Sequence, residues 1–198
     1  MTTAAAHRTY EELRTGFTWA AVERELGWAP PDRINIGWYC SDRICRLGLA
    51  RKRALLWEDF AGHARTYTFD DLRVLSNTVA RFLSELGIAP GERVCLFLDR
   101  IPELYLSFLG ILKMGGVAQP LFSAFGDESL WTRLADAGTA AILTQRRHLP
   151  KVRKIREKLP SLRKVIVVDA AGGAMQEREV PMALDALPRV EELEVFPS

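Results

Sequence analysis

The stretch VCLFLDRIPELYLSFLGILKMGGVAQPLFSAFG, residues 94–126, decides the fold of this chain. Its first five residues form an apolar run of strand length, typical of a parallel strand covered on both faces. Pro102 suits the first position of a helix, where a missing N–H breaks no hydrogen bond. The apolar segment 104–114 then predicts a helix covered by protein, which a glycine pair ends. The stretch therefore predicts a strand–helix–strand unit with a loop after its second strand.

Composition places the chain among globular proteins. It has 198 residues, of which 48% are hydrophobic and 26% charged, and its formal net charge is +2. This length supports one substantial core. The low net charge indicates no obligatory nucleic-acid partner, and no apolar run approaches the length of a membrane span. Because the first residues lack the apolar core of a signal peptide, we expect a cytoplasmic protein that does not bind membranes.

Metal-binding and common catalytic signatures are missing from the sequence. Cys95 lies within the apolar strand, and Cys40 and Cys45 have no second Cys or His pair at zinc-site spacing. The three histidines are scattered, and no nucleophile-elbow or metal-helix motif occurs. We therefore predict no metal site and no catalytic residue within this chain.

Residues 1–50 are predicted to form a helical N-terminal extension. One short helix is expected at 18–26, before the proline pair Pro30-Pro31. A second is expected at 35–47, lying across the main sheet. Its predicted inward face consists of Ile36, Tyr39, Cys40 and Ile44.

Strands and helices alternate over residues 51–169. The pattern predicts a hairpin, then a helix over 70–86 that begins at a capping box in TFDD, residues 68–71. Further helices are expected at 127–137, with Asp127 as N-cap and Trp131 on the inner face, and at 149–159. Further strands are expected at 140–144 and 164–169. This alternation predicts an α/β fold with a doubly wound, mainly parallel sheet and flanking helices.

Residues 170–198 carry weaker signals. We interpret them as an incomplete connecting segment with one short helix at 182–187.

Two stretches are candidates for binding, because ligands of open α/β sheets bind at the carboxyl ends of strands. The loop FSAFG, residues 122–126, has small residues and precedes a helix with free N–H groups, although an ordinary turn has the same pattern. Asp99 and Arg100 also follow a strand, facing either a cleft or solvent.

The second candidate is a basic tract over residues 145–164. It holds nine cations against one anion, Glu157, a local charge of +8. Clustered cations attract phosphates, whereas a solvated helix face is the simpler interpretation. No aromatic residues interleave with them, which disfavours nucleic-acid binding.

Three runs resemble the AMP-forming acyl-CoA synthetases of the adenylate-forming superfamily, and acetyl-CoA synthetases most of all. They are YTFDDL (67–72), residues 87–126 and RLADAGTAAILTQ (133–145). GFTWAAVERELGW (16–28) and NIGWYCSDR (35–43) resemble the lead-in of that group. The resemblance implies the N-terminal subdomain of such an enzyme over residues 51–169.

The resemblance also implies a reaction and its substrates. A small carboxylate, acetate by resemblance, reacts with ATP and Mg²⁺ to give an acyl-adenylate, and coenzyme A then displaces AMP. Three residues match those lining the pantetheine tunnel: Phe122, Ser123 and Ala124. In the family, arginines shortly after the strand that matches residues 140–144 contact the nucleotide phosphates of coenzyme A. The matching candidates here are Arg146, Arg147, Lys151 and Arg153, and Pro150 aligns with one of the family's arginine positions.

Several motifs of the family are absent from these 198 residues, among them the Ser/Thr/Gly-rich phosphate loop ending in Pro-Lys-Gly. Because adenylation needs cations and donors aimed at phosphoryl oxygens, we predict that this chain alone is inactive and acts with the rest of a ligase. The alternative is a free-standing flavodoxin-like binding module, or a degenerate remnant, that holds a nucleotide or a protein partner. The coding sequence past Ser198 distinguishes the two.

Overall fold

The computed structural model describes residues 9–28, 34–170 and 174–193. The chain divides into two compact units, Met1–Ile34 and Asn35–Ser198. The first unit holds α1 (Tyr10–Gly16) and α2 (Trp19–Leu26). The helix α2 confirms the prediction at 18–26, and its first turn is capped by the Thr18 side chain, whereas α1 was not predicted.

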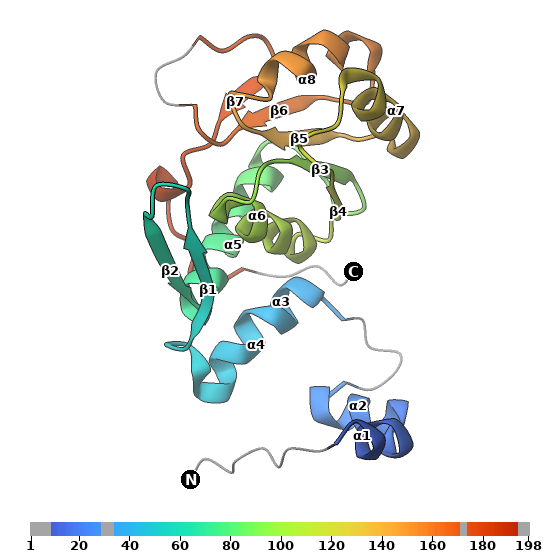
Figure 1. Cartoon of the computed structure of the whole chain (residues 1–198), viewed down its shortest axis with the longest axis vertical. Coiled ribbons are helices and arrows are strands. Elements are labelled where there is room, and N and C mark those ends of the chain that lie inside the picture. Colours follow the sequence, from blue (N-terminus) through green and yellow to red (C-terminus); the bar gives the residue numbers. More distant parts are fainter. Residues whose placement is uncertain (1–8, 29–33, 171–173, 194–198) are drawn as a thin grey trace. The chain divides into compact units, whose positions relative to one another are not determined.

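The second unit is built on a five-stranded sheet (Figure 1) in which every neighbouring pair is parallel. The strand order is β4-β3-β5-β6-β7. The strands are β3 (Arg93–Phe97), β4 (Val117–Pro120), β5 (Ala141–Thr144), β6 (Lys164–Val167) and β7 (Glu179–Pro181). If β3 is counted as the first strand, this is the flavodoxin-like order 2-1-3-4-5. The predicted doubly wound parallel sheet is therefore confirmed.

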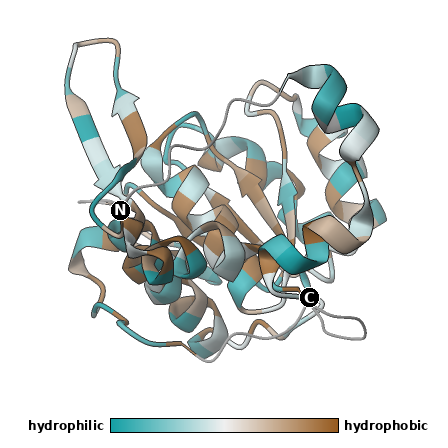
Figure 2. Cartoon of the chain, turned by 90° about the horizontal axis from the view of Figure 1, so that it is seen from below, coloured by the Kyte–Doolittle hydropathy of each residue, from teal (hydrophilic) through white to brown (hydrophobic). Residues whose placement is uncertain are grey.

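Helices cover both faces of this sheet, and Figure 2 shows the apolar strands between them. One face is covered by α5 (Phe69–Glu85) and α6 (Pro102–Lys113). The other is covered by α7 (Asp127–Ala137) and α8 (Leu149–Ile155), the latter continued by a 3₁₀ turn, η2 (Arg156–Lys158). Successive side chains of β3 divide between them, because Leu96 packs toward α5 and α6 and Phe97 toward α7 and α8.

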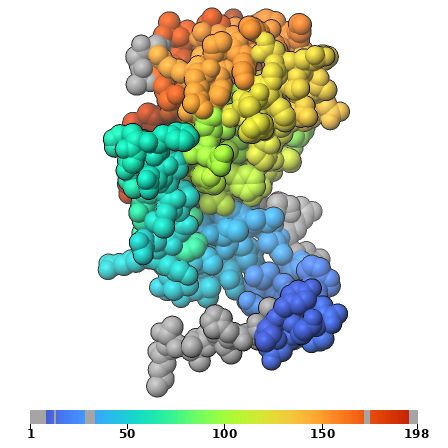
Figure 3. Space-filling model, viewed as in Figure 1, coloured from blue at the N-terminus to red at the C-terminus, as the bar shows by residue number. Residues whose placement is uncertain are grey.

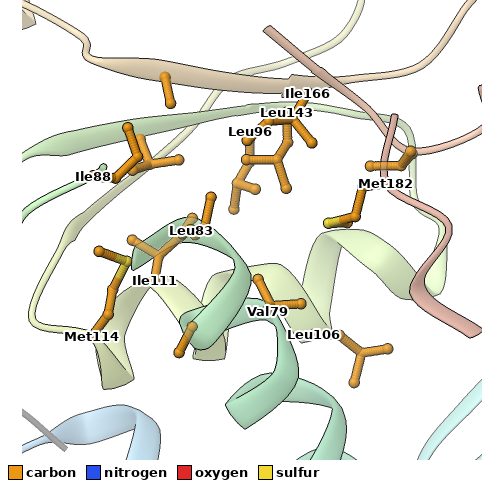
Figure 4. Packing of buried hydrophobic residues seen from close by; sticks show 14 of the residues in the cluster. Val79, Leu83, Ile88, Leu96, Leu106, Ile111, Met114, Leu143, Ile166 and Met182 are labelled. Atoms are coloured by element: carbon orange, nitrogen blue, oxygen red, sulfur yellow. The ribbon is translucent and has the colours of Figure 1, made fainter. Parts of the chain in front are cut away.

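The core between the sheet and the helices α5 and α6 consists of packed hydrophobic side chains (Figure 4). Its fully buried residues include Val79, Leu83, Leu96, Leu106, Ile111, Leu143, Ile166 and Met182. Gly110 lets α6 approach α5, since a Cβ there would lie 2.8 Å from Val79 Cβ and 2.9 Å from the Ser76 carbonyl oxygen. The strand–helix–strand unit of residues 94–126 is therefore the centre of the fold.

The predicted hairpin and capping box are both confirmed. The strands β1 (Arg53–Glu58) and β2 (Ala64–Thr68) pair antiparallel. At the start of α5, the Asp71 N–H donates to Thr68 Oγ1 at 3.2 Å, and the Thr68 N–H donates to Asp71 Oδ2 at 2.8 Å. Each residue thus satisfies a backbone donor that the first turn leaves free.

The helix predicted over 35–47 is divided in the structure. It consists of α3 (Ile36–Cys40), α4 (Asp42–Ile44) and a π-helical turn, η1 (Cys45–Leu49). The helix α3 packs on α6, and the expected inward face was wrong, because Ile36 and Cys40 are exposed. Gly37 and Ser41 are buried instead and are small enough to let the two helices touch: a Cβ on Gly37 would lie 2.7 Å from the Leu109 carbonyl oxygen.

Three expected details of the helices α6 and α7 were wrong. The N-cap of α7 is Gly126 rather than Asp127, and Trp131 is exposed. The helix α6 is not covered all round, since Tyr105 and Phe108 reach the surface. Both border an apolar groove of about 410 Å³ between α6 and the hairpin, which lie side by side in Figure 3.

The C-terminal segment contributes the edge strand β7, which the sequence pattern did not predict. It pairs parallel with β6, and Met182, just after it, is fully buried. A three-residue strand is too short for a readable alternation, and it contains a buried charged residue, Glu179. The short helix expected at 182–187 is a single 3₁₀ turn, η3 (Leu184–Ala186).

Over the three described stretches of the chain, we find no helix with both the length and the apolar character needed to span a bilayer.

Candidate functional site

The carboxyl ends of β3 and β5 mark the place where the strand order reverses. Ligands of open parallel sheets bind at such a point. In this chain, Asp99 follows β3, residues 145–148 form a turn after β5, and the predicted loop 122–126 follows the neighbouring β4. The fold therefore brings two of the predicted stretches, the loop and the start of the basic tract, to one edge of the sheet.

Asp99 lies at the centre of this edge. Its Oδ1 accepts a hydrogen bond from Ser123 Oγ at 2.7 Å and lies 3.1 Å from His148 Nε2. Its Oδ2 forms an ion pair with Arg147, and its backbone N–H donates to the Gln145 side-chain oxygen at 2.9 Å. We call Asp99, Ser123, Arg147 and His148 the Asp99 cluster.

The environment of Asp99 favours its ionised form. Partial burial would raise the pKa of this carboxyl, but hydrogen bonds from Arg147, Ser123 and His148 outweigh it and lower the pKa below its ordinary value. The His148 ring also packs on Phe97, with ring centroids 5.3 Å apart. The cluster therefore holds a fixed negative charge among donors.

Lys151 lies on α8 and holds the loop after β4. Its Nζ donates to the backbone carbonyl oxygens of Ser123 at 3.2 Å and Phe125 at 2.9 Å. It also lies 5.6 Å from the centroid of the Phe97 ring. This cation was predicted to contact phosphates, and in the structure two of its donors are directed at backbone oxygens of the loop instead.

The outer side of the loop is open. Phe122 is 66% exposed and packs edge-to-face on Phe125, with ring centroids 5.9 Å apart. Ala124 is also exposed. A ligand can thus approach an aromatic ring and a small side chain without displacing any core residue.

Two predicted site residues lie away from this loop. The Arg146 N–H donates to Asp169 Oδ1 at 2.7 Å, after β6. Arg153 makes two hydrogen bonds of 2.7 Å to the carboxylate of Glu179, on β7. Both arginines border a shallow pocket of about 220 Å³, whose other described lining residues are Leu149, Pro150, Ala174 and Met175.

The basic tract is less free than its charge suggests. Five of its nine cations form ion pairs with carboxylates outside the tract: Arg147, Arg153, Lys154, Arg156 and Arg163. More than half of the cations of the tract are therefore paired with protein carboxylates. Arg146 and Arg147 nevertheless keep exposed side chains, the latter while it is paired with Asp99.

Gln145 and His148 were not predicted as site residues, and the sequence pattern of Asp99 was compatible with either a cleft or the surface. The sequence around each of these residues contains no recognisable binding motif. They come together only because the strand order places them at the reversal point. Within the part of the chain that the structure describes, no group of three or more His, Cys, Asp or Glu side chains is arranged to hold a metal ion.

Comparison with known proteins agrees with this fold. Residues 48–193 match the family described as AMP-binding enzyme. The chain is 33% identical over 162 residues to the acetyl-coenzyme A synthetase of Bacillus subtilis (strain 168), which covers 81% of this chain. This chain spans only 28% of the length of that relative.

Solved structures show the same likeness. The crystal structure of the Brucella canis acyl-CoA synthetase matches 94% of this chain with a TM-score of 0.78 and 26% identity, over 33% of its own length. The anthranilate CoA ligase AuaEII, solved in complex with anthranoyl-AMP, matches 85% of this chain with a TM-score of 0.71 and 26% identity, over 30% of its length. Because the family match extends over most of the sequence, the chain belongs to the AMP-binding enzyme family, as its resemblance predicted.

Proposed function

We propose that this chain forms the N-terminal part of an acyl-CoA ligase, with acetate as the favoured carboxylate, and that its own share of the active site binds coenzyme A. The observation that carries the proposal is the meeting of the loop 122–126 with the turn 145–148 at the reversal point of the sheet. Relatives that match this chain include acetyl-coenzyme A synthetases, which supports acetate as the substrate.

The loop 122–126 and the turn 145–148 suit different parts of coenzyme A. The exposed Phe122 and Ala124 offer apolar surface to the pantetheine arm, and Ser123 stands between them. The exposed guanidinium groups of Arg146 and Arg147 suit the nucleotide phosphates, because arginine binds phosphate through paired N–H donors. Lys151 and Arg153 are less exposed than these two arginines, so we rank them lower.

Calorimetric titration of the 198-residue chain with coenzyme A tests the proposal. We expect binding that weakens by about fivefold to tenfold in the Arg147→Ala variant, because a charge-assisted hydrogen bond is lost. Ala124→Trp fills the exposed side of the loop and should abolish binding. Lys158→Ala is the matched control, since it removes one exposed charge of the same tract away from the loop. Equal losses in all three variants would refute a site at the loop.

The 3′-phosphate and catalysis are tested separately. If Arg146 and Arg147 contact the nucleotide, coenzyme A should bind more tightly than its form lacking the 3′-phosphate. The chain alone should show no carboxylate-dependent exchange between ATP and pyrophosphate, because the phosphate loop of the family is not among its residues. Robust exchange would contradict this expectation.

The flavodoxin-like strand order supports a second candidate, a free-standing nucleotide-binding module. That module would bind AMP as well as coenzyme A, and its coding sequence would stop after Ser198. An open frame that continues into a Ser/Thr/Gly-rich loop ending in Pro-Lys-Gly favours the ligase.

A further inference from the structure

We propose that Asp99 is a positioning residue, whose carboxylate fixes the loop 122–126 and the turn 145–148 relative to each other. The contacts that carry this inference are within the chain. Only its consequence for a ligand rests on the proposed binding of coenzyme A.

The contacts join segments that are far apart in the sequence. Ser123 is 24 residues from Asp99, and His148 is 49 residues from it, yet both approach the same oxygen, Oδ1. The Asp99 backbone adds a third link, since its N–H donates to the Gln145 side chain at 2.9 Å. Asp99, which follows β3, is therefore bonded both to the loop after β4 and to the turn after β5.

The two oxygens of Asp99 face different surroundings. The side chains of Asp99 and His148 are only 19% and 11% exposed, so water competes poorly for the contacts at Oδ1. Arg147, the partner of Oδ2, is 65% exposed. The oxygen Oδ1 thus joins the two segments, whereas Oδ2, which is itself buried, pairs with a guanidinium group on an exposed side chain that an anion can reach.

Substitutions at position 99 can therefore separate the hydrogen-bond acceptor of Asp99 from its negative charge. Asparagine at position 99 keeps an oxygen that can accept from Ser123, and it removes the charge that Arg147 faces. Alanine removes both. If Asp99 positions the two segments, Asp99→Asn should preserve their order and Asp99→Ala should lose it.

Hydrogen exchange measured by mass spectrometry on the 198-residue chain tests the proposal without any ligand. Each segment has a protected amide: Phe125 N–H donates to the Phe122 carbonyl oxygen at 3.0 Å, and His148 N–H donates to that of Gln145 at 2.9 Å. In Asp99→Ala we expect exchange to rise about tenfold in both segments, because the carboxylate contacts with Ser123 and His148 are lost. In Asp99→Asn it should stay within about threefold of the wild type.

Asp169→Ala is the matched control. Asp169 accepts from the Arg146 N–H at 2.7 Å, so its loss should raise exchange in the turn and leave the loop unchanged. If Asp99→Ala does not fold, Ser123→Ala provides the test, because it removes the donor to Oδ1 and should raise exchange in the loop. The proposal would be overturned if exchange in Asp99→Ala were unchanged in either segment, or if alanine and asparagine at position 99 had equal effects. If Ser123→Ala is used in its place, unchanged exchange in the loop would overturn it.

Titration with coenzyme A is a separate measurement on the same proteins. We expect binding about tenfold weaker in Asp99→Ala and within about threefold of the wild type in Asp99→Asn. A wild-type chain that does not bind coenzyme A would refute the proposed function, while the exchange result would still decide the role of Asp99.

Discussion

Lys113 and Arg147 each pair with an aspartate, in contrasting surroundings. Lys113 Nζ lies 2.5 Å from Asp42 Oδ2, and its side chain is completely buried between α4, α5 and α6. It also donates to Asn77 Oδ1 at 2.7 Å and to the Arg73 carbonyl oxygen at 3.2 Å. Arg147 pairs with Asp99 at the edge of the sheet, and its side chain is 65% exposed.

The difference shows how one kind of contact serves either structure or binding. All three donors of the Lys113 ammonium have a protein acceptor, so this cation has none to offer a ligand. Burial lowers the pKa of Lys113 and its bond to Asp42 opposes that shift, as expected for a charge held inside the protein. The exposed guanidinium of Arg147 can meet solutes from solvent. Burial of the cation therefore distinguishes the structural pair from the candidate site.

Lys113→Met is the strongest test of that comparison. It leaves the Asp42 carboxylate and two oxygen acceptors partly buried without their cation, which should lower the free energy of unfolding by about 3–5 kcal/mol. Urea unfolding followed by circular dichroism measures the change. Adding Asp42→Asn removes the leftover charge and should recover part of the loss. A loss below about 1 kcal/mol would show that this pair is not a structural one.

Gly110→Ala sharpens the structural side of the comparison. Alanine usually stabilises a helix interior by about 0.5–1 kcal/mol relative to glycine. Here the added Cβ would lie 2.8 Å from Val79 Cβ, so we expect the opposite sign, a loss of about 1–3 kcal/mol from forcing α5 and α6 apart. The urea midpoint reports the sign directly, and stabilisation would mean that these helices can separate at little cost.

The parts of the fold that were predicted from the sequence are those with local signals. The apolar run at β3, the capping box at Thr68 and Asp71, and the four inward residues of 149–159 each depend on neighbours a few positions away. The break at Ser41 and the strand β7 depend on partners elsewhere in the chain: α6 for the first and β6 for the second. Tertiary packing therefore explains these differences.

The same reason applies to the candidate site. The loop 122–126, Arg147 and Lys151 come after strand ends that the sequence pattern locates. Asp99 becomes the partner of Ser123 and Arg147 only because β3 lies between β4 and β5, an order that periodicity does not contain. Likewise, Lys113 interrupts an apolar helix in the sequence, and its acceptors come from two other helices.

The pH dependence of stability tests the site side of the comparison. Because the pKa of Asp99 is lowered in the folded state, its charge stabilises the fold above its ordinary pKa, and this contribution is lost as the pH falls through the folded pKa. We expect the wild type to exceed Asp99→Asn in stability by about 1 kcal/mol or less at pH 7, since Arg147 is exposed. The difference should shrink from about pH 5 downward. A difference that grows in acid would contradict the assigned charge.

Lys154→Ala has the smallest expected effect and measures how much a surface-exposed ion pair contributes to stability. Lys154 Nζ lies 3.1 Å from Asp127 Oδ2, with side chains 67% and 40% exposed. Because water and ions compete for both groups, the free energy of unfolding should change by about 0.5 kcal/mol or less, and the change should fade in about 1 M salt. Urea unfolding at low and high salt measures both. If this loss matched that of Lys113→Met, burial of the cation would not separate structural pairs from the rest.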